Sequence, residues 1–512
     1  MSRTAIPPRL IYPPPRDAQW GDGVLRMGSQ ASLHVAAGVD ADLVSLCQRL
    51  WHAFTRETGS LQVVRHDDWA GHRFVLVGEG APGEGPASPG QGDGYSLTVD
   101  DRAAAATAHD DTGLRHAWLT LMQMLHVASL EPGGECFDIT HARIRDGAAL
   151  AFRGIHLCVF PETSMLLLEK ALRLIGMLKF THVVLEFWGT LKLDALPELA
   201  WPGAMDKATA RRLIDIAREM GVEPIPMFNS WGHAAQSRVA FGRHVVLDQN
   251  PRLAPLFEPD GWTWCLANPD TRKLLDEVVR ELAAFAGPGG YFHLGCDEAY
   301  SHATCDRCRA AGSPAGLLAE HLNRLAETVA SLDRRPIIWG DALLDATRWR
   351  HPIEATSRAD QQTHLALPEL SRSFVIADWQ YWLKEGDVPS VAYFADAGFD
   401  VLACPWDNRD NVRTLAHATR AHRAAGMLVT TWDRLPTQLR ELVYAASGAW
   451  CEDPGVLEGP AFSPIRFTST ATLLRLLTPV RGRYAQAGWL RHEVTATAVV
   501  DAAHGLAIDG LT

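Results

Sequence analysis

The chain of 512 residues lacks several features that would mark a membrane or nucleic-acid-binding protein. No apolar run reaches the roughly 18 residues needed to cross a membrane, so we expect no membrane partner. Lys, Arg, Asp and Glu are scattered along the whole chain, with a net charge of −12 and no basic block or arm. Nucleic acid is therefore not an expected partner either.

Signals of secretion are also missing. The N-terminus, MSRTAIPPRLIYPPPRDAQW, has no apolar core of a signal peptide, and the chain has no Asn-x-Ser/Thr sequon. Its nine cysteines are an odd number spread over the whole length, which indicates reduced thiols rather than a disulfide framework. These absences together predict a cytoplasmic protein. The sequence gives no oligomeric state, so a homodimer stays open.

Tryptophan, by contrast, is abundant, with 17 residues in the chain. Two interpretations compete at this point. The tryptophans either fill a large core or form flat apolar walls for a ligand with CH faces, such as a sugar.

The first 147 residues predict an N-terminal α+β domain. Leu61–Val64, Arg73–Val77 and Tyr95–Val99 are strand-like, and the apolar residues of 43–54 and 114–125 keep helical spacing. A Gly/Pro-rich loop, EGAPGEGPASPGQGDG, interrupts this region. At the other end, residues 464–512 predict a C-terminal helical extension with one helix, Thr470–Leu477.

Between these ends, residues 148–463 alternate strand-like and helical runs eight times. The predicted strands are Ile155–Phe160, His182–Phe187, Glu223–Phe228, Tyr291–Gly295, Pro336–Trp339, Phe374–Ala377, Val401–Cys404 and Met427–Thr430. Alternation of this kind predicts a parallel sheet, and eight units predict an α/β fold of the closed (β/α)8 TIM-barrel type. An open doubly wound sheet is the alternative, which the lack of a Gly-rich phosphate fingerprint disfavours.

The strand ends of this predicted barrel carry tryptophans and acids. In a TIM barrel the active site lies at the C-terminal ends of the strands. From the second strand to the eighth, the ends read Glu186-Phe187-Trp188, Asn229 with Trp231 and His233, Asp297-Glu298, Trp339 with Asp341, Asp378 to Trp382, Trp406-Asp407 and Trp432-Asp433. An aromatic-walled pocket rimmed with acids suits a neutral sugar, whose CH faces stack on rings and whose hydroxyls donate to carboxylates.

The fourth strand end places two acids side by side. Alternate residues of a strand share a face, so His293 and Asp297 point into the barrel while Glu298 would point outward. Glu298 serves the pocket only if the strand has already turned into the loop. Two acids with different neighbours can then divide the work, one ionised and one donating a proton. The alternative is a solvated strand end without a catalytic role.

The segment His293-Leu-Gly-Cys-Asp-Glu298 resembles the H-x-G-G-D-E signature of glycoside hydrolase family 20, the β-N-acetylhexosaminidases. Further segments resemble family elements in the same order: Phe152-Arg153-Gly154, residues 226–233, Trp339-Gly-Asp341, Trp379-Gln-Tyr381, and before the barrel YSLTV with the helix of 113–125. The chain departs from the family at Cys296, at Cys158 and at Trp432-Asp433, so the divergent intracellular-type members are the closest likeness.

The resemblance implies substrate-assisted catalysis without a cofactor and without a catalytic metal. The 2-acetamido carbonyl of a terminal β-linked N-acetylhexosamine attacks C1, with an oxazolinium intermediate and net retention. It implies that Asp297 holds the acetamido N–H, that Glu298 is the general acid and base, and that Tyr381 donates to the acetamido oxygen.

The resemblance and the strand ends also imply a set of substrate-binding residues. Arg153 is expected on ring hydroxyls, with tryptophans walling the sugar and histidines behind the carboxylates. The full set is Arg153, Glu186, His233, His293, Trp339, Trp379, Trp406, Trp432 and Asp433. Rival hypotheses are an ordinary retaining glycosidase with Glu186 and Glu298 as its carboxylate pair, and a non-catalytic sugar-binding barrel.

One motif stands apart from this chemistry. His302, Cys305 and Cys308 follow the two acids closely, and a C-x-x-C pair can be half of a zinc site. A fourth ligand is not evident in the sequence, although Cys296 or a distant cysteine would serve. A redox function and plain loop cysteines are the alternatives.

Overall fold

The computed structural model describes residues 11–28, 30–55, 59–78, 94–129, 136–161, 163–234, 247, 250–433 and 435–458. The chain divides into two compact units: residues 1–149, 170–179 and 446–512 form one, and residues 150–169 and 180–445 form the other. The predicted helix Thr470–Leu477 lies outside the described residues.

The first unit holds an eight-stranded sheet in the order β1-β8-β5-β6-β4-β2-β3, with β7 also paired to β8. The strands are β1 (Asp17–Gly28), β2 (Gln30–Ala36), β3 (Ser60–His66), β4 (His72–Val77), β5 (Tyr95–Val99), β6 (Ala104–Ala108), β7 (Leu125–Ser129) and β8 (Cys136–Asp146). Sequence reasoning found only β3, β4 and β5. It missed β6 because its residues, AAATA, carry no polar alternation, and all five are buried.

Helices α1 (Ala41–Phe54) and α2 (Asp111–Met124) complete the α+β fold of this unit. Asp40 and Asp110 start them as N-caps, because each carboxylate accepts a backbone N–H of the first turn. The expectation of a small α+β unit before the barrel is confirmed.

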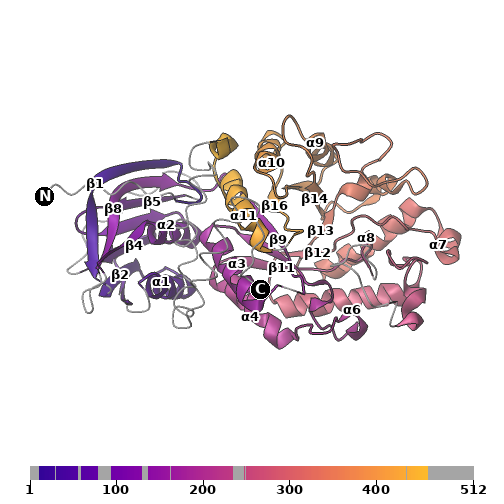
Figure 1. Ribbon diagram of the computed structural model, residues 1–512, viewed down its shortest axis with the longest axis horizontal. Helices are drawn as coiled ribbons and strands as arrows, with labels where there is room; N and C mark the ends of the chain where they lie inside the picture. Colours follow the sequence, from indigo (N-terminus) through magenta and orange to yellow (C-terminus); the bar gives the residue numbers. More distant parts are fainter. Residues whose placement is uncertain are drawn as a thin grey trace. The chain divides into compact units, whose positions relative to one another are not determined.

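The second unit is a closed barrel of eight parallel strands (Figure 1). The strands are β9 (Phe152–Cys158), β10 (His182–Glu186), β11 (Glu223–Met227), β12 (Tyr291–His293), β13 (Arg335–Trp339), β14 (Val375–Trp379), β15 (Asp400–Cys404) and β16 (Gly426–Val429). Strand β16 pairs in parallel with β9 and closes the barrel. The predicted TIM barrel is therefore confirmed, with each strand within three residues of its expected bounds.

Helices follow the strands along the chain. They are α3 (Met165–Met177), α4 (Lys207–Glu219), α6 (Pro269–Ala286), α7 (Asp306–Ala311), α8 (Pro314–Ala330), α9 (Pro389–Asp396), α10 (Arg409–Ala421) and α11 (Leu435–Trp450). Short 3-10 helices cover Trp188–Thr190, Pro197–Leu199, Pro251–Leu256, Asp341–Leu343, Thr363–Glu369 and Pro454–Glu458. Asn268 and Ser313 are N-caps followed by proline at the first helical position, which needs no N–H donor there. Among the described residues, none of the helices is long and apolar enough to span a membrane.

Tryptophans take both roles considered from the sequence: some fill the core and others face the ligand cavity. Trp51, Trp118, Trp231, Trp264, Trp339 and Trp450 are fully buried. The barrel interior is a packed core that includes Val184, Ile225, Ile337 and Leu402. Tyr381 and Trp432 pack on this core while only partly buried, so they belong to the layer where the core meets the site.

Candidate active site

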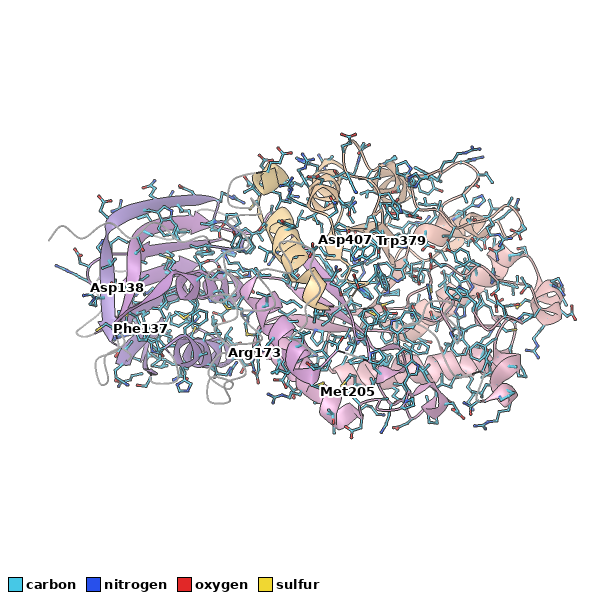
Figure 2. All side chains as sticks on the ribbon, in the orientation of Figure 1. Phe137, Asp138, Arg173, Met205, Trp379 and Asp407 are labelled. Carbon is cyan, nitrogen blue, oxygen red and sulfur yellow. The ribbon has the colours of Figure 1, made fainter. Side chains whose placement is uncertain are left out.

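A cavity beside this layer has a volume of about 320 Å³. It lies at the C-terminal strand ends, which Trp379 and Asp407 mark in Figure 2. Its walls are Glu186, Trp188, Asn229, His233, Asp297, Glu298, Glu354, Trp379, Tyr381, Trp382, Trp406 and Trp432. Five tryptophans, one tyrosine and four carboxylates therefore converge on a space that accommodates a sugar ring.

The chain after β12 turns so that both adjacent acids reach this cavity. Strand β12 ends at His293, and Gly295, Cys296 and Glu298 adopt φ values of +69°, +82° and +46°. At Gly295 a side chain is excluded, since a Cβ atom would lie 2.3 Å from Asn229 Oδ1. The turn satisfies the condition that the sequence set for Glu298, because its side chain does not follow the strand alternation.

A histidine lies between the two acids. His233 Nε2 is 3.4 Å from Asp297 Oδ2 and 3.2 Å from Glu298 Oε2. His233 has φ +52°, in the left-handed region that non-glycine residues rarely adopt. The strain at His233 and Glu298 is typical of functional sites, where the surrounding structure holds an unfavourable backbone.

The acids and the histidine set each other's charge. Burial alone would lower the pKa of His233, but Asp297 and Glu298 raise it to about 10, so the imidazole is cationic at neutral pH. Burial acts to raise the pKa of Glu298, but hydrogen bonding and the charge of His233, helped by the Tyr300 hydroxyl, lower it overall. The site therefore stores a proton on His233 rather than on Glu298.

Asp341 supports the acids from behind. Its Oδ2 accepts the backbone N–H of Glu298 at 3.1 Å and the Thr356 hydroxyl at 2.6 Å, and its Oδ1 accepts Trp379 Nε1–H at 3.1 Å. Burial and the charge of Asp297 raise the pKa of Asp341 to about 7. This carboxylate fixes the backbone that carries Glu298 and one wall of the cavity.

Two polar groups of the cavity are suited to bind a ligand. Asp297 Oδ1 is buried and has no hydrogen-bond partner among the described residues. Tyr381 Oη accepts Trp432 Nε1–H at 2.5 Å and also has a hydrogen bond with the Thr430 hydroxyl, and a phenol O–H can turn toward a ligand that enters the cavity. A buried acceptor and a hydroxyl donor of this kind match an amide, which offers one N–H and one C=O.

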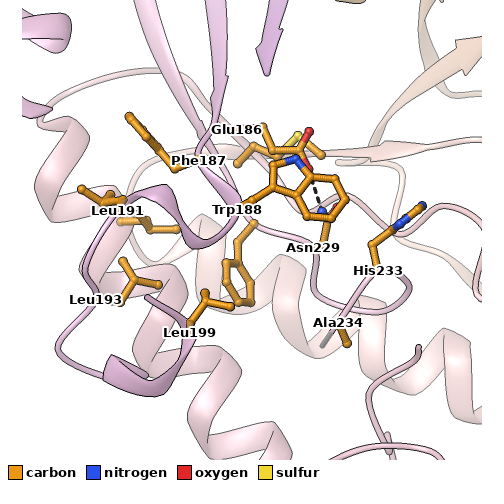
Figure 3. A pocket seen from close by; sticks show the side chains of 12 residues that line it. Glu186, Phe187, Trp188, Leu191, Leu193, Leu199, Asn229, His233 and Ala234 are labelled. Carbon is orange, nitrogen blue, oxygen red and sulfur yellow. Dashed lines mark hydrogen bonds between the residues drawn. The ribbon is translucent and has the colours of Figure 1, made fainter. Parts of the chain in front are cut away.

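Glu186 is already engaged by its neighbours. His156 Nε2 lies 2.7 Å from its Oε2, and Asn229 Nδ2 donates to its Oε1 at 2.7 Å. In Figure 3 the Asn229 contact overlaps the ring of Trp188, with His233 to the right and leucines to the left. These leucines line a small apolar pocket beside the cavity, so Glu186 stands where apolar and polar walls meet.

Eight of the predicted site residues line the cavity. They are Glu186, His233, Asp297, Glu298, Trp379, Tyr381, Trp406 and Trp432. The rings of Trp379 and Tyr381 stack at 5.1 Å, and Trp406 meets Tyr381 edge-on at 5.4 Å. The sequence thus placed the acids and most of the aromatic wall together.

Four predicted substrate-binding residues do not line the cavity, and two of them lie beneath it. Trp339 is only 1% exposed and packs between His293, at a ring distance of 4.4 Å, and Trp432, at 5.8 Å. His293 is fully buried, and its Nδ1 accepts the N–H of Gly295. Neither lines the described cavity, because the inward-facing side chains of a barrel stack in layers and these belong to a lower one. The place of His293 behind the carboxylates and the contact of Trp339 with the sugar stay predictions.

Arg153 and Asp433 also lie outside the described cavity wall, for other reasons, and their contact with substrate stays a prediction. Arg153 stands at the beginning of β9, opposite to the strand end that carries the site, and its Nη1 donates to the backbone oxygen of Leu150. Asp433 is exposed beyond the end of β16 and is not part of the cavity wall. A short motif located these residues in sequence, but only the strand bounds show which end of the barrel each occupies.

Four residues of the wall had no role assigned from the sequence. Trp188, Asn229 and Trp382 stood at predicted strand ends, which was the available signal. Glu354 lies in the connection between β13 and β14, where no periodic pattern points to it. Its carboxyl group is half-buried, and burial together with the charge of Glu298 raises its pKa despite a hydrogen bond with Trp382.

The fold and the acid-rich aromatic cavity define a carbohydrate-processing barrel, and comparisons with known proteins agree. The sequence pattern of the glycosyl hydrolase family 20 catalytic domain matches residues 186–433, and that of domain 2 of the same family matches residues 9–147. Together they cover most of the chain. The chain therefore belongs to glycosyl hydrolase family 20, the β-N-acetylhexosaminidase family, and it is a glycoside hydrolase.

Solved structures share the fold at low sequence identity. The chitobiase of Flavobacterium johnsoniae is 16% identical with a TM-score of 0.67, covering 94% of this chain and 75% of that one. The exo-β-N-acetylglucosaminidase of Vibrio harveyi, solved with N-acetylglucosamine, is 15% identical with a TM-score of 0.65, covering 94% and 79%. The β-N-acetylhexosaminidase of Streptomyces coelicolor is 17% identical with a TM-score of 0.62, covering 91% and 96%. No curated protein matches the chain by sequence.

Proposed function

We propose that the enzyme is a retaining exo-glycosidase that releases terminal β-linked N-acetylhexosamine by substrate-assisted catalysis. The observation that carries the proposal is the buried Asp297 Oδ1, which has no partner among the described residues and lies in the same cavity wall as Glu298 and Tyr381. A buried carboxylate oxygen without a donor is costly, and an acetamido N–H supplies the missing donor.

In the proposed reaction the acetamido oxygen attacks C1 and the glycosidic C1–O bond breaks. Asp297 accepts the acetamido N–H and stabilises the positive charge of the oxazolinium ring, while Tyr381 donates to the acetamido oxygen. Glu298 gives its proton to the departing oxygen and then takes one from the water that opens the ring. Trp379, Trp406 and Trp432 stack on the sugar.

The acid step needs a protonated Glu298, whereas the site holds its proton on His233. A bound sugar removes water from the Glu298 carboxyl group, and burial favours the neutral form of an acid. We propose that binding returns the proton from His233 to Glu298, with Nε2 and Oε2 only 3.2 Å apart.

Two alternatives fit the geometry less well. A carboxylate nucleophile would be Glu186, but both of its oxygens are engaged by His156 and Asn229. A non-catalytic sugar-binding barrel would not need Asp297 and Glu298 on the same cavity wall. The cytoplasmic location and the homodimer stay predictions.

The decisive experiment uses three nitrophenyl glycosides on the purified enzyme. We expect release of nitrophenol from the β-N-acetylglucosaminide or β-N-acetylgalactosaminide, and almost none from the β-glucoside, which lacks the acetamido group. A thiazoline analogue of N-acetylglucosamine should inhibit competitively, because it has the shape of the proposed intermediate. Equal rates on the β-glucoside, without thiazoline inhibition, would contradict the proposal.

A further inference from the structure

Four metal-ligating side chains gather beside the catalytic loops and take no part in the proposed reaction. Glu258 and Cys265 belong to the connection between β11 and α6, and Cys305 and Cys308 belong to the start of α7. Cys265 Sγ lies 3.6 Å from the sulfur of Cys305 and 3.6 Å from that of Cys308. One ligand atom from each of the four residues lies within 4.8 Å of the others.

These separations match tetrahedral zinc rather than a disulfide. Zinc–sulfur bonds of about 2.3 Å place the sulfur atoms of a tetrahedron about 3.8 Å apart, whereas a disulfide requires about 2.05 Å. Three thiolates and one carboxylate are a donor set that zinc accepts. We propose that Glu258, Cys265, Cys305 and Cys308 bind one structural zinc ion.

Glu258 supplies an independent reason to expect a cation. It is only 1% exposed, and its Oε2 accepts the N–H of Cys305 at 2.6 Å and the hydroxyl of Thr304 at 3.1 Å. Its other oxygen, Oε1, is buried and has no hydrogen-bond partner among the described residues. The hydrogen bonds to Cys305 and Thr304 account for the position of Oε2 only. A metal ion would bind Oε1.

The surroundings of the sulfur atoms also fit thiolate ligands. The backbone N–H of Cys308 points to Cys305 Sγ at 3.3 Å, and Arg307 Nη1 lies 3.8 Å from Cys265 Sγ. Donors of this kind orient ligands and offset the excess negative charge of a thiolate-rich site. Arg307 balances only part of the negative charge of three thiolates and one carboxylate. The metal ion would balance most of the rest.

The site differs from the one that the sequence motif suggested. His302 is not a ligand, because its Nδ1 accepts Trp231 Nε1–H at 3.1 Å and its Nε2 meets the backbone oxygen of Pro314 at 2.9 Å. Cys296 is engaged with the backbone oxygen of Leu294 instead. The distant cysteine is Cys265, and Glu258 replaces the histidine.

A zinc ion here would link two chain connections. The connection between β11 and α6 carries His233 and Trp262, and the connection between β12 and α7 carries Glu298. Trp262, between Glu258 and Cys265, donates its Nε1–H to the backbone oxygen of Glu298 at 2.5 Å. Its ring lies 4.6 Å from that of His233. The ion would thus hold Trp262 in place and, through it, the backbone of Glu298.

The test begins with the metal content of the full-length enzyme, purified without a metal-chelating column. Elemental analysis should find about one zinc per chain. Cys308→Ser and Glu258→Ala should lower the zinc content at least fivefold, whereas the control Cys136→Ser, outside the cluster, should keep it. Chelator-stripped wild type should melt several degrees lower and recover with zinc.

A second measurement protects the test against variants that fail to fold. Stripped wild-type enzyme reloaded with Co²⁺ should show sulfur-to-cobalt charge-transfer absorption with the intensity expected for three thiolates. Zinc-free enzyme with all nine thiols titratable, or with a mass two hydrogens lower from a Cys265 disulfide, would overturn the proposal. Both readouts are independent of glycosidase activity, so failure of the proposed reaction would leave them unaffected.

Discussion

The adjacent acids with His233 and the cysteine cluster are built from the same two chain connections, but they balance negative charge in different ways. Asp297 and Glu298 share His233, a cation from the chain itself, at 3.4 Å and 3.2 Å. Glu258 and its three cysteines have one cationic side chain at a sulfur among the described contacts, since Arg307 Nη1 lies 3.8 Å from Cys265 Sγ. A reacting site needs a proton that can move, whereas a structural site is better served by an ion that stays.

The largest effect common to all N-acetylhexosaminide substrates is expected from Asp297→Asn, which keeps the shape of the acid cluster and removes the charge of Asp297. Activity should fall by about 10²–10³ on both activated and unactivated N-acetylhexosaminides, since the developing cation loses its partner in either case. Steady-state kinetics on a nitrophenyl and an alkyl glycoside measures this. A loss confined to the alkyl glycoside would contradict the assigned role.

Glu298→Gln should separate the two substrates that Asp297→Asn treats alike. On the alkyl glycoside kcat should fall by roughly 10²–10⁴, because the leaving oxygen needs a proton. The nitrophenyl substrate should suffer far less, since its leaving group departs as a stable anion. Equal losses on both would reject Glu298 as the acid.

His233→Gln tests whether the His233 imidazolium balances the negative charge of Asp297 and Glu298. The raised pKa of His233 means that its stabilising contribution is complete below pH 6.5 and is lost as the pH rises toward 10. The wild-type advantage in unfolding free energy should therefore shrink across this range, by up to about 5 kcal/mol at roughly 1.4 kcal/mol per pKa unit. Denaturant titrations of wild type and variant at several pH values measure this difference. A pH-independent difference would contradict an ion pair of His233 with Asp297 and Glu298.

Trp262→Phe probes the link between the two clusters. It keeps an aromatic ring near His233 and removes the indole donor to the Glu298 backbone. We expect kcat to fall about fivefold to tenfold, the effect of one hydrogen bond, with unchanged zinc content. A simultaneous loss of zinc would show that Trp262 shapes the metal site rather than joining it to the acid.

Trp382→Ala should have the smallest effect. Trp382 is 53% exposed at the cavity wall, where it is suited to stack on the sugar beyond the cleaved bond. We expect KM to rise about threefold to tenfold for chitooligosaccharides and to stay almost unchanged for nitrophenyl substrates, with Trp379 and its neighbours left intact. Similar changes on both would contradict an aglycone role.

Much of the fold followed from local patterns. Alternating strand and helix runs identified all eight barrel strands, because β-branched runs, N-caps such as Asn268 and proline at the first helical position act over a few residues. The same reasoning missed β1, β2 and β8 of the first unit, whose stability depends on pairing partners. The register Asp17↔Arg145 joins residues far apart in sequence, and no local signal reports it.

The sequence by itself determined the barrel, the adjacent acids of the fourth strand and the aromatic strand ends, since each depends on residue types at short spacing. Only the tertiary structure decided that Glu298 turns into the cavity, that Arg153 stands at the opposite strand end, and that Glu258 joins three cysteines. Contacts of this kind are made by side chains from different loops. Their distances arise when the barrel closes, so no short stretch of sequence encodes them.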